Sequence, residues 1–174
     1  YKAQRAPMPE ALAQQIAPIH EAVRLLGWPV LEVPGIEADD AIGTLAAIAT
    51  ASGHKVLIST GDKDLAQLVT PQVTWMNTMA KPPEVLDVDG VLAKFGVPPQ
   101  RIVDYLTLVG DTVDNVPGVE KVGPKTAVKW LTQYGSLDGV VAAAADIGGV
   151  VGENLRRALD FLPLGRRLVT VACD

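Results

Sequence analysis

The apolar stretch at residues 55–60 narrows the possible folds of this chain more than any other feature. Val56-Leu57-Ile58-Ser59-Thr60 is nearly continuously apolar, which is typical of a parallel strand buried on both faces. An alanine-rich helix is predicted at residues 41–51, closed by Ser52-Gly53, and a short helix is predicted after the strand, through Val69. This alternation of helix and strand indicates βαβ units and a mostly parallel sheet.

The other predicted elements divide into an α/β part and a helical part. A kinked amphipathic helix is predicted from Pro9 to Gly27, with Pro18 at the kink. The elements expected after it are strands at 28–33 and 73–76 and helices at 88–95, 99–109, 124–134, 137–145 and 153–162. Because the apolar spacing becomes helical near residue 85, we expect an α/β core at residues 1–85 and a helical subdomain at residues 86–174.

Composition argues against a disulfide-stabilised protein and against a membrane protein. A chain of 174 residues that is 48% hydrophobic can bury one core and add a small helical appendage. We expect its three tryptophans, Trp28, Trp75 and Trp130, to pack inside. A single cysteine, Cys173, rules out an internal disulfide and fits a reducing compartment. No stretch has the length of a membrane span or the pattern of a signal peptide, so we expect no membrane association.

Seven acidic residues form three short clusters, each where an apolar element meets a turn. The clusters are Glu37-Ala38-Asp39-Asp40, Asp62-Lys63-Asp64 and Asp111-Thr112-Val113-Asp114. Carboxylates this close repel one another unless a cation neutralises them, and all-oxygen ligand sets suit Mg²⁺ or Mn²⁺ rather than zinc or copper. The clusters therefore predict a divalent-metal site of the kind used most often for phosphoryl transfer. With these acids set aside, the remaining surface is slightly basic, so the formal net charge of −5 does not exclude a nucleic-acid partner.

Each cluster also has an ordinary structural explanation. Asp39 could be a helix cap and nothing more, and Asp62 and Asp64 could be simple turn formers. Asp111 and Asp114 could be solvated loop acids. For any one cluster taken singly, these alternatives stay open.

A glycine-bracketed turn at residues 118–123 predicts a phosphate-binding element. The turn runs directly into the helix predicted at 124–134, and such turns present backbone N–H groups and a helix N-terminus to an anion. The residues expected to contact nucleic-acid backbone are Gly118, Lys121, Val122, Gly123, Lys125, Thr126 and Lys129. Contacts of this kind are salt-dependent and blind to base sequence. The alternative is an ordinary helix-hairpin packed against the core.

Four motifs occur in order along the chain. They are Tyr1-Lys2 with Arg5 and Pro9; residues 35–40; Ser59-Thr60-Gly61-Asp62-Lys63-Asp64; and Gly110-Asp111-Thr112-Val113-Asp114-Asn115-Val116-Pro117-Gly118 leading to Val122-Gly123-Pro124-Lys125-Thr126-Ala127. Together they resemble the flap endonuclease family, and in particular the 5′ nuclease domain attached to bacterial DNA polymerase I. The resemblance covers nearly the whole chain. It implies a Rossmann-like (PIN-like) sheet core followed by a helical subdomain with a helix-three-turn-helix DNA-binding motif.

The resemblance also implies ligands and partners. Glu37 and Asp39, with Asp40 nearby, would hold one of two Mg²⁺ or Mn²⁺ ions, while Asp62 and Asp64 reach the other with Asp114 and, through water, Asp111. Lys2 and Arg5 would contact the scissile phosphate, and the carbonyls of residues 118–123 would hold a K⁺ ion. The implied substrate is flapped, nicked or branched duplex DNA, including RNA-primed ends. The implied setting is a monomer in the bacterial cytoplasm, near the nucleoid, with a polymerase domain in the same polypeptide.

Three functions follow from these patterns. The first is a metal-dependent 5′-3′ exonuclease and flap endonuclease of replication and repair. The family's domain begins with a strand and acidic residues that have no match here, so we expect an N-terminally truncated domain. The second hypothesis is accordingly a catalytically incomplete, structure-specific DNA-binding module. The third is a metal-dependent phosphatase acting on small molecules.

Overall fold

A small mixed sheet forms the centre of the α/β part. The structure is a computed structural model that describes residue 3 and residues 6–174. Strand β1 (Val56–Ser59) pairs in parallel with β2 (Val73–Asn77), with Ile58 opposite Trp75. Strand β3 (Glu84–Leu86) adds to β2 in the antiparallel direction, giving the order β1-β2-β3. The predicted parallel pair is confirmed, and Trp75 is buried as expected.

The elements on either side of β1 carry two of the three acidic clusters. Helix α2 (Ala38–Ala51) contacts both β1 and η1 (Lys63–Leu68), a 3-10 helix that leaves the end of β1. Leu65 and Ala66 of η1 are fully buried, which fixes the turn at the end of β1. The helix predicted through Val69 therefore exists, in the tighter 3-10 form.

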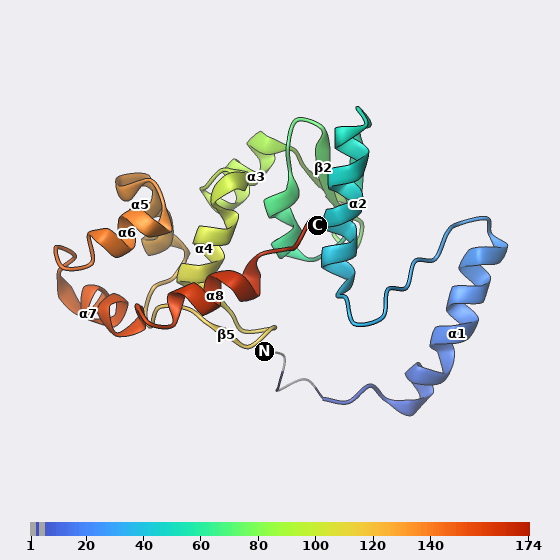
Figure 1. Cartoon of the computed structure of the whole chain (residues 1–174), viewed down its shortest axis with the longest axis horizontal. Coiled ribbons are helices and arrows are strands. Elements are labelled where there is room, and N and C mark those ends of the chain that lie inside the picture. The colour runs from blue at the N-terminus through green and yellow to red at the C-terminus, as the bar shows by residue number, and fades with distance from the viewer. Residues whose placement is uncertain (1–2, 4–5) are drawn as a thin grey trace.

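The second half of the chain is helical and packs around a central helix. Its elements are α3 (Val88–Phe95), η2 (Pro99–Arg101), α4 (Ile102–Val109), β4 (Gly110–Asp111), β5 (Val116–Pro117), α5 (Pro124–Tyr134), α6 (Leu137–Ala142), α7 (Gly149–Ala158) and α8 (Leu162–Val169). Helix α4 is buried along most of its length and packs against α5 and α8. Its apolar residues belong to the same hydrophobic core cluster as the sheet, so the helical half is anchored to the α/β half (Figure 1).

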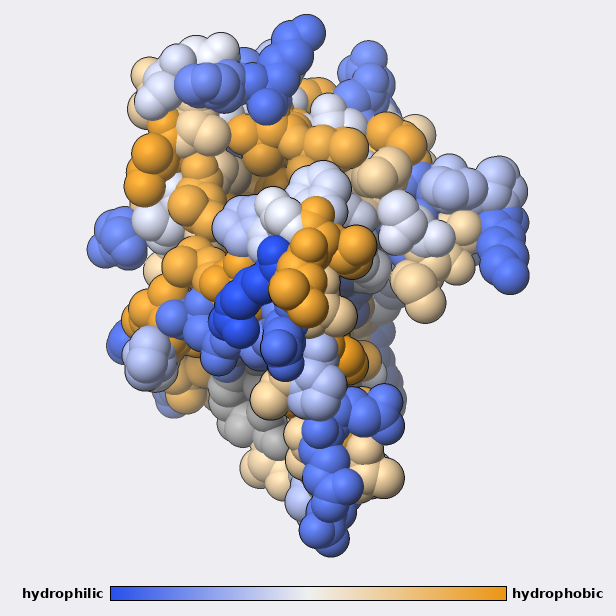
Figure 2. All heavy atoms as spheres, turned by 90° about the vertical axis from the view of Figure 1, so that its right-hand side faces the viewer, coloured by the Kyte–Doolittle hydropathy of each residue, from blue (hydrophilic) through white to orange (hydrophobic). Residues whose placement is uncertain are grey.

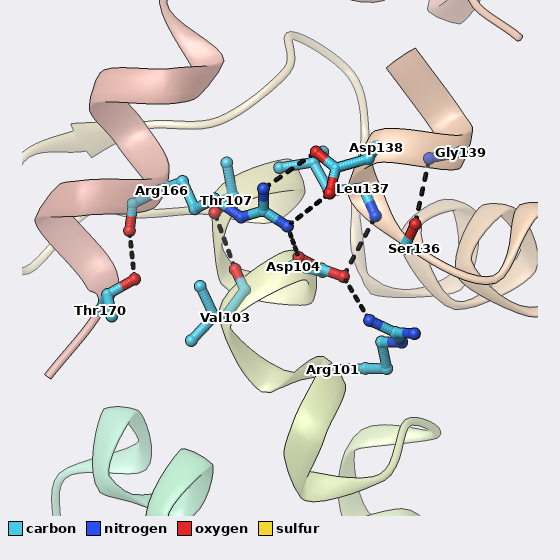
Figure 3. A network of polar contacts seen from close by, with 10 residues as sticks. All are labelled: Arg101, Val103, Asp104, Thr107, Ser136, Leu137, Asp138, Gly139, Arg166 and Thr170. Atoms are coloured by element: carbon cyan, nitrogen blue, oxygen red, sulfur yellow. Dashed lines mark hydrogen bonds and ion pairs between the residues drawn. The ribbon is translucent and has the colours of Figure 1, made fainter. Parts of the chain in front are cut away.

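A buried carboxylate in α4 ties this helix to its neighbours (Figure 3). Asp104, which is 3% exposed, accepts hydrogen bonds from Arg166 of α8 at 2.8 Å, Arg101 at 3.3 Å and the backbone N–H of Leu137 at 3.1 Å. Arg166 also donates to Asp138, which is on α6. The hydrogen bond with Asp138 and, against partial burial, the ion pair with Asp104 raise the pKa of the Arg166 guanidinium. Helices α4, α6 and α8 are therefore joined by one charged network.

The first helix lies apart from this body. Helix α1 (Glu10–Leu25) contains Pro18 as predicted, but none of its residues is buried (Figure 1). The strand predicted at 28–33 is not formed, and Trp28 is 68% exposed, so both predictions are wrong. A strand needs a neighbour for its backbone N–H and C=O groups, and in the described part of the chain no strand pairs with this segment. Figure 2 shows apolar side chains at the surface on this side of the molecule.

Several element boundaries differ from the predicted ones. Helix α6 ends at Ala142 rather than near residue 145, and α7 begins at Gly149 rather than near residue 153. Strand β3 and the β4–β5 hairpin were not predicted, because strands of two or three residues are too short to show a periodicity. Helix α8 was not predicted either, and it begins where the helix predicted at 153–162 was expected to end. Within residues 3 and 6–174, no helix is long and apolar enough to cross a membrane.

Candidate metal centre and nucleic-acid interface

The first acidic cluster occupies the N-terminal turn of α2. Glu37 is the residue before the helix, yet its side chain makes no capping hydrogen bond. Asp39 and Asp40 follow in the first turn, where the helix dipole favours negative charge. One oxygen of Asp40 accepts the backbone N–H of Ala172 at 2.8 Å. The side chain of Glu37 is thus not a helix cap.

The second cluster sits where β1 turns into η1. Asp62 caps η1, because its Oδ1 accepts the backbone N–H of Asp64 at 3.0 Å. The indole N–H of Trp75 donates to the Asp62 carbonyl at 2.9 Å, so the buried sheet holds this turn in place. The turn-forming explanation is correct for one oxygen of Asp62. It does not explain Asp64.

Asp64 carries a buried oxygen that makes no hydrogen bond within the described structure. Its Oδ1 is shielded from solvent and has no hydrogen-bond partner. Burial, together with repulsion from the nearby Asp62 and Asp111, raises the pKa of Asp64 from its ordinary value of 3.8 to about 7. An unpaired buried carboxylate is costly, and a bound cation would remove that cost.

The third cluster shapes the β4–β5 hairpin. Asp111 is 4% exposed, and its Oδ1 accepts the backbone N–H groups of Val113 at 2.7 Å and Asp114 at 3.2 Å. Its Oδ2 forms an ion pair with Lys63 at 2.8 Å. Burial acts to raise the pKa of Asp111, but the contact with Lys63 and the backbone hydrogen bonds outweigh it and lower that pKa. Lys63 therefore joins the second cluster to the third.

The three clusters meet at two adjoining hollows in the surface. The first hollow is lined by Glu37, Asp39, Asp40, Asp64, Asp114 and residues 167–171. The second is lined by Gly61, Asp62, Lys63, Asp64, Asp111, Val113 and Asp114. Asp64 and Asp114 line both. In the described part of the chain, however, no three His, Cys, Asp or Glu side chains are placed so that they could already hold a metal ion.

Two groups of residues at this site had no signal in the sequence. Gln67 lies on η1 beside Asp64, and residues 167–171 reach the first hollow from the other end of the chain. A single glutamine and an ordinary helix end carry no motif, so only the fold reveals them. The two residues predicted to contact the scissile phosphate, Lys2 and Arg5, lie outside the described residues.

The turn at residues 118–123 presents the start of α5 to solvent. Lys121 adopts a positive φ of 64°, and the N–H of Val122 closes the turn on the Val119 carbonyl at 3.0 Å. Gly123 precedes α5 and Pro124 occupies its first turn. Lys121, Lys125 and Lys129 are all exposed, and Trp130 is buried as expected.

A buried asparagine from α7 supports this turn. Asn154 is 2% exposed, and its Nδ2 donates to the Glu120 carbonyl at 2.7 Å. Its Oδ1 accepts a hydrogen bond from Arg157. The sequence gives no sign of this contact, because the two ends of the hydrogen bond are 34 residues apart.

Comparison with known proteins assigns the chain to a family. The family model described as the 5′-3′ exonuclease N-terminal resolvase-like domain matches residues 1–96, and the model described as the 5′-3′ exonuclease C-terminal SAM fold matches residues 97–174. The chain belongs to the 5′-3′ exonuclease family. This confirms the family resemblance and the predicted fold class.

The relatives of this chain include longer proteins. It is 53% identical over 186 residues to DNA polymerase I of Pseudomonas aeruginosa, covering 100% of this chain but only 20% of that protein. It is 51% identical over 141 residues to the 5′-3′ exonuclease of Aquifex aeolicus, covering 81% of this chain and 48% of the relative. A structure of the flap endonuclease of bacteriophage T5 in a complex with DNA and metal ions has a TM-score of 0.80 at 21% identity, covering 96% of this chain and 62% of that one.

Proposed function

We propose that this chain provides a metal-dependent 5′-3′ exonuclease and flap endonuclease activity. Its substrate would be flapped, nicked or branched duplex DNA, including RNA-primed ends, in replication and repair. The observation that carries this proposal is the meeting of three acidic clusters at two adjoining hollows in a chain of the 5′-3′ exonuclease family. Its likeness to DNA polymerase I supports a polymerase domain in the same polypeptide and a bacterial cytoplasmic location.

The residues around the hollows suit two Mg²⁺ or Mn²⁺ ions. The acidic residues that line the hollows offer carboxylate oxygens, which these ions prefer, and the buried Oδ1 of Asp64 has no hydrogen-bond partner and could serve as a ligand. Glu37, Asp39 and Asp40 would serve one ion and Asp62 the other, with Asp64 and Asp114 between them. When bound, such ions activate water and stabilise the leaving oxygen of a phosphodiester.

Other residues of the chain would hold the ligands in place. Both oxygens of Asp111 are engaged, one with the backbone of its own turn and the other with Lys63. We therefore assign Asp111 the role of orienting Asp114 and Lys63, with any contact to an ion made through water. Lys2 and Arg5 remain the proposed contacts to the scissile phosphate, on the basis of the resemblance alone.

The turn at 118–123 and the start of α5 would grip the DNA backbone. Three exposed lysines and the positive end of the α5 helix dipole offer positive potential to phosphate. A K⁺ ion held by the carbonyls of this turn is part of the proposal, again by family resemblance.

We expect Asn154→Leu to weaken DNA binding while cleavage of bound DNA continues at its normal rate. The substitution removes the hydrogen bond that fixes the Glu120 carbonyl and so loosens the turn. The KM for a 5′-flap substrate should rise about 10-fold, the effect of losing roughly 1.4 kcal/mol of binding, with kcat unchanged. Steady-state kinetics at two salt concentrations measure this. Lys125→Ala is the comparison, because it should lower the salt dependence by removing one phosphate contact. An equal loss of kcat in Asn154→Leu would contradict a role confined to binding.

A labelled 5′-flap substrate tests the proposed function itself. The chain should release product with Mg²⁺ and none with a chelator, and Asp62→Asn should abolish release. Asp160→Asn is the matched control, since Asp160 is exposed and lines neither hollow. Cleavage that persists with chelator, or that survives in Asp62→Asn, would refute the assignment.

A DNA-binding module without turnover is the second candidate. It is favoured by the finding that no three potential ligands among the described residues already form an ion site. Tight, salt-sensitive binding of flap DNA with no product at any Mg²⁺ or Mn²⁺ concentration would establish it in place of the nuclease.

A further inference from the structure

The last residues of the chain form part of the wall of the candidate metal centre. In Figure 1 the segment after α8 runs to the side of α2, where the C-terminus lies. Val169, Thr170 and Val171 line the first hollow together with the acidic residues of α2 and η1. This segment is far from both acidic clusters in the sequence, so its presence there is a property of the fold.

Gln67 binds this segment to the element that carries Asp64. Its Nε2 donates to the Asp64 carbonyl at 2.8 Å and to the Val169 carbonyl at 2.9 Å. Its Oε1 accepts the backbone N–H of Val171 at 3.0 Å. Both ends of one side-chain amide are thus used in contacts between η1 and the C-terminal segment.

The same segment is also attached to α2. The N–H of Ala172 donates to Asp40 Oδ1 at 2.8 Å. Gly43 allows the close approach, because a Cβ atom there would lie 2.7 Å from a methyl carbon of Val171 and 2.9 Å from the Ala172 carbonyl oxygen. The segment at residues 169–172 therefore connects the acidic cluster of α2 to that of η1.

We propose that Gln67 is a positioning residue, which acts through residues 169–172 to set the spacing between the α2 carboxylates and Asp64. The inference rests on the proposed function, since it concerns the same metal centre. Oxygen ligands must approach a divalent ion within about 2.0–2.6 Å, so a small shift of either wall weakens binding. Residues that orient metal ligands typically contribute 10–100-fold to affinity or activity.

Gln67→Leu tests this proposal, because it nearly keeps the side-chain volume and removes all three hydrogen bonds. Titration calorimetry with Mn²⁺ and the Mg²⁺ dependence of flap cleavage are the measurements. We expect the Kd for Mn²⁺ to rise about 10-fold or more. Cleavage should need correspondingly more Mg²⁺, while flap-DNA binding in chelator stays unchanged. Gln72→Leu is the matched control, since Gln72 is exposed.

The outcomes separate this inference from the proposed function. If the wild-type chain and Gln72→Leu bind Mn²⁺ and Gln67→Leu binds it equally well, the positioning role is refuted and the nuclease assignment stands. If the wild-type chain binds no Mn²⁺, both fail. Should Gln67→Leu not fold, Gly43→Ala tests the position of the same segment, because its Cβ would lie too close to residues 171–172 and displace them. Unchanged Mn²⁺ affinity in Gly43→Ala would then refute the proposal.

Discussion

Replacing Asp64 with asparagine should inactivate the protein and make its metal-free form more stable. Asp64 lines both hollows and carries the unpaired buried oxygen, so we propose it as the central ligand. Cleavage of a 5′-flap substrate by Asp64→Asn should fall by at least about 100-fold. Loss of a residue that only orients a metal ligand costs up to about 100-fold, and loss of the ligand itself should cost at least as much. Initial rates at saturating Mg²⁺ measure this fall.

The gain in stability follows from the raised pKa of Asp64. Below pH 3.8 the carboxyl is protonated in both the folded and the unfolded chain. As the pH rises from 3.8 to about 7, the unfolded chain releases this proton while the folded chain keeps it, so the free energy of unfolding falls. Above about pH 7 the folded wild-type chain carries the full free-energy cost of the buried, charged carboxylate. Asparagine is neutral, so Asp64→Asn avoids this cost.

The size of this gain can be estimated from the two pKa values. Their difference corresponds to about 4 kcal/mol, which partial solvent exposure reduces to about 2 kcal/mol. In chelator at pH 8 the thermal midpoint of Asp64→Asn should therefore exceed that of the wild type by roughly 6 °C, and the excess should vanish near pH 4. Asp160→Asn should show neither effect. A less stable Asp64→Asn at pH 8 would mean that Asp64 is paired in the folded chain, and normal cleavage would mean that it is not a ligand.

Replacing the buried Asp104 with alanine should cause a large loss of stability. Asp104 is almost fully buried and pairs with Arg166 and Arg101 and with the backbone N–H of Leu137. Its removal leaves the buried N–H group of Leu137 without its acceptor and leaves Arg166 paired only with the exposed Asp138, which costs about 3–5 kcal/mol. The thermal midpoint should fall by about 10 °C, as measured by circular dichroism.

Asp138→Ala provides the control for this prediction. Asp138 pairs with the same arginine, but its side chain is 76% exposed. Exposed ion pairs contribute about 0–1 kcal/mol, so its loss should lower the midpoint by only a few degrees. Equal losses in the two variants would show that burial of Asp104 is not what makes this network stabilising.

The predicted elements that proved correct are those with long, consistent patterns. The helices at 10–25, 38–51, 88–95 and 124–134 match their predicted spans closely. In each of them apolar residues repeat at helical spacing, and glycine or proline lies near an end. The prediction of a strand at 28–33 was wrong. Its apolar residues match the pattern of a strand, but the described part of the chain offers no partner strand for it. Strand formation depends on a neighbour, which local sequence does not contain.

The sequence by itself determined the family, the alternation of strand and helix, and which seven acids to examine, since these depend on residue type and spacing along the chain. Only the tertiary structure decided that Asp64 is the buried, unpaired carboxylate and that Asp111 is engaged by Lys63. It also decided that residues 169–171 line the site and that Gln67 ties them to η1. The physical reason is that burial and hydrogen-bond partners are set by segments far apart in the chain, and no local pattern records which of them will meet.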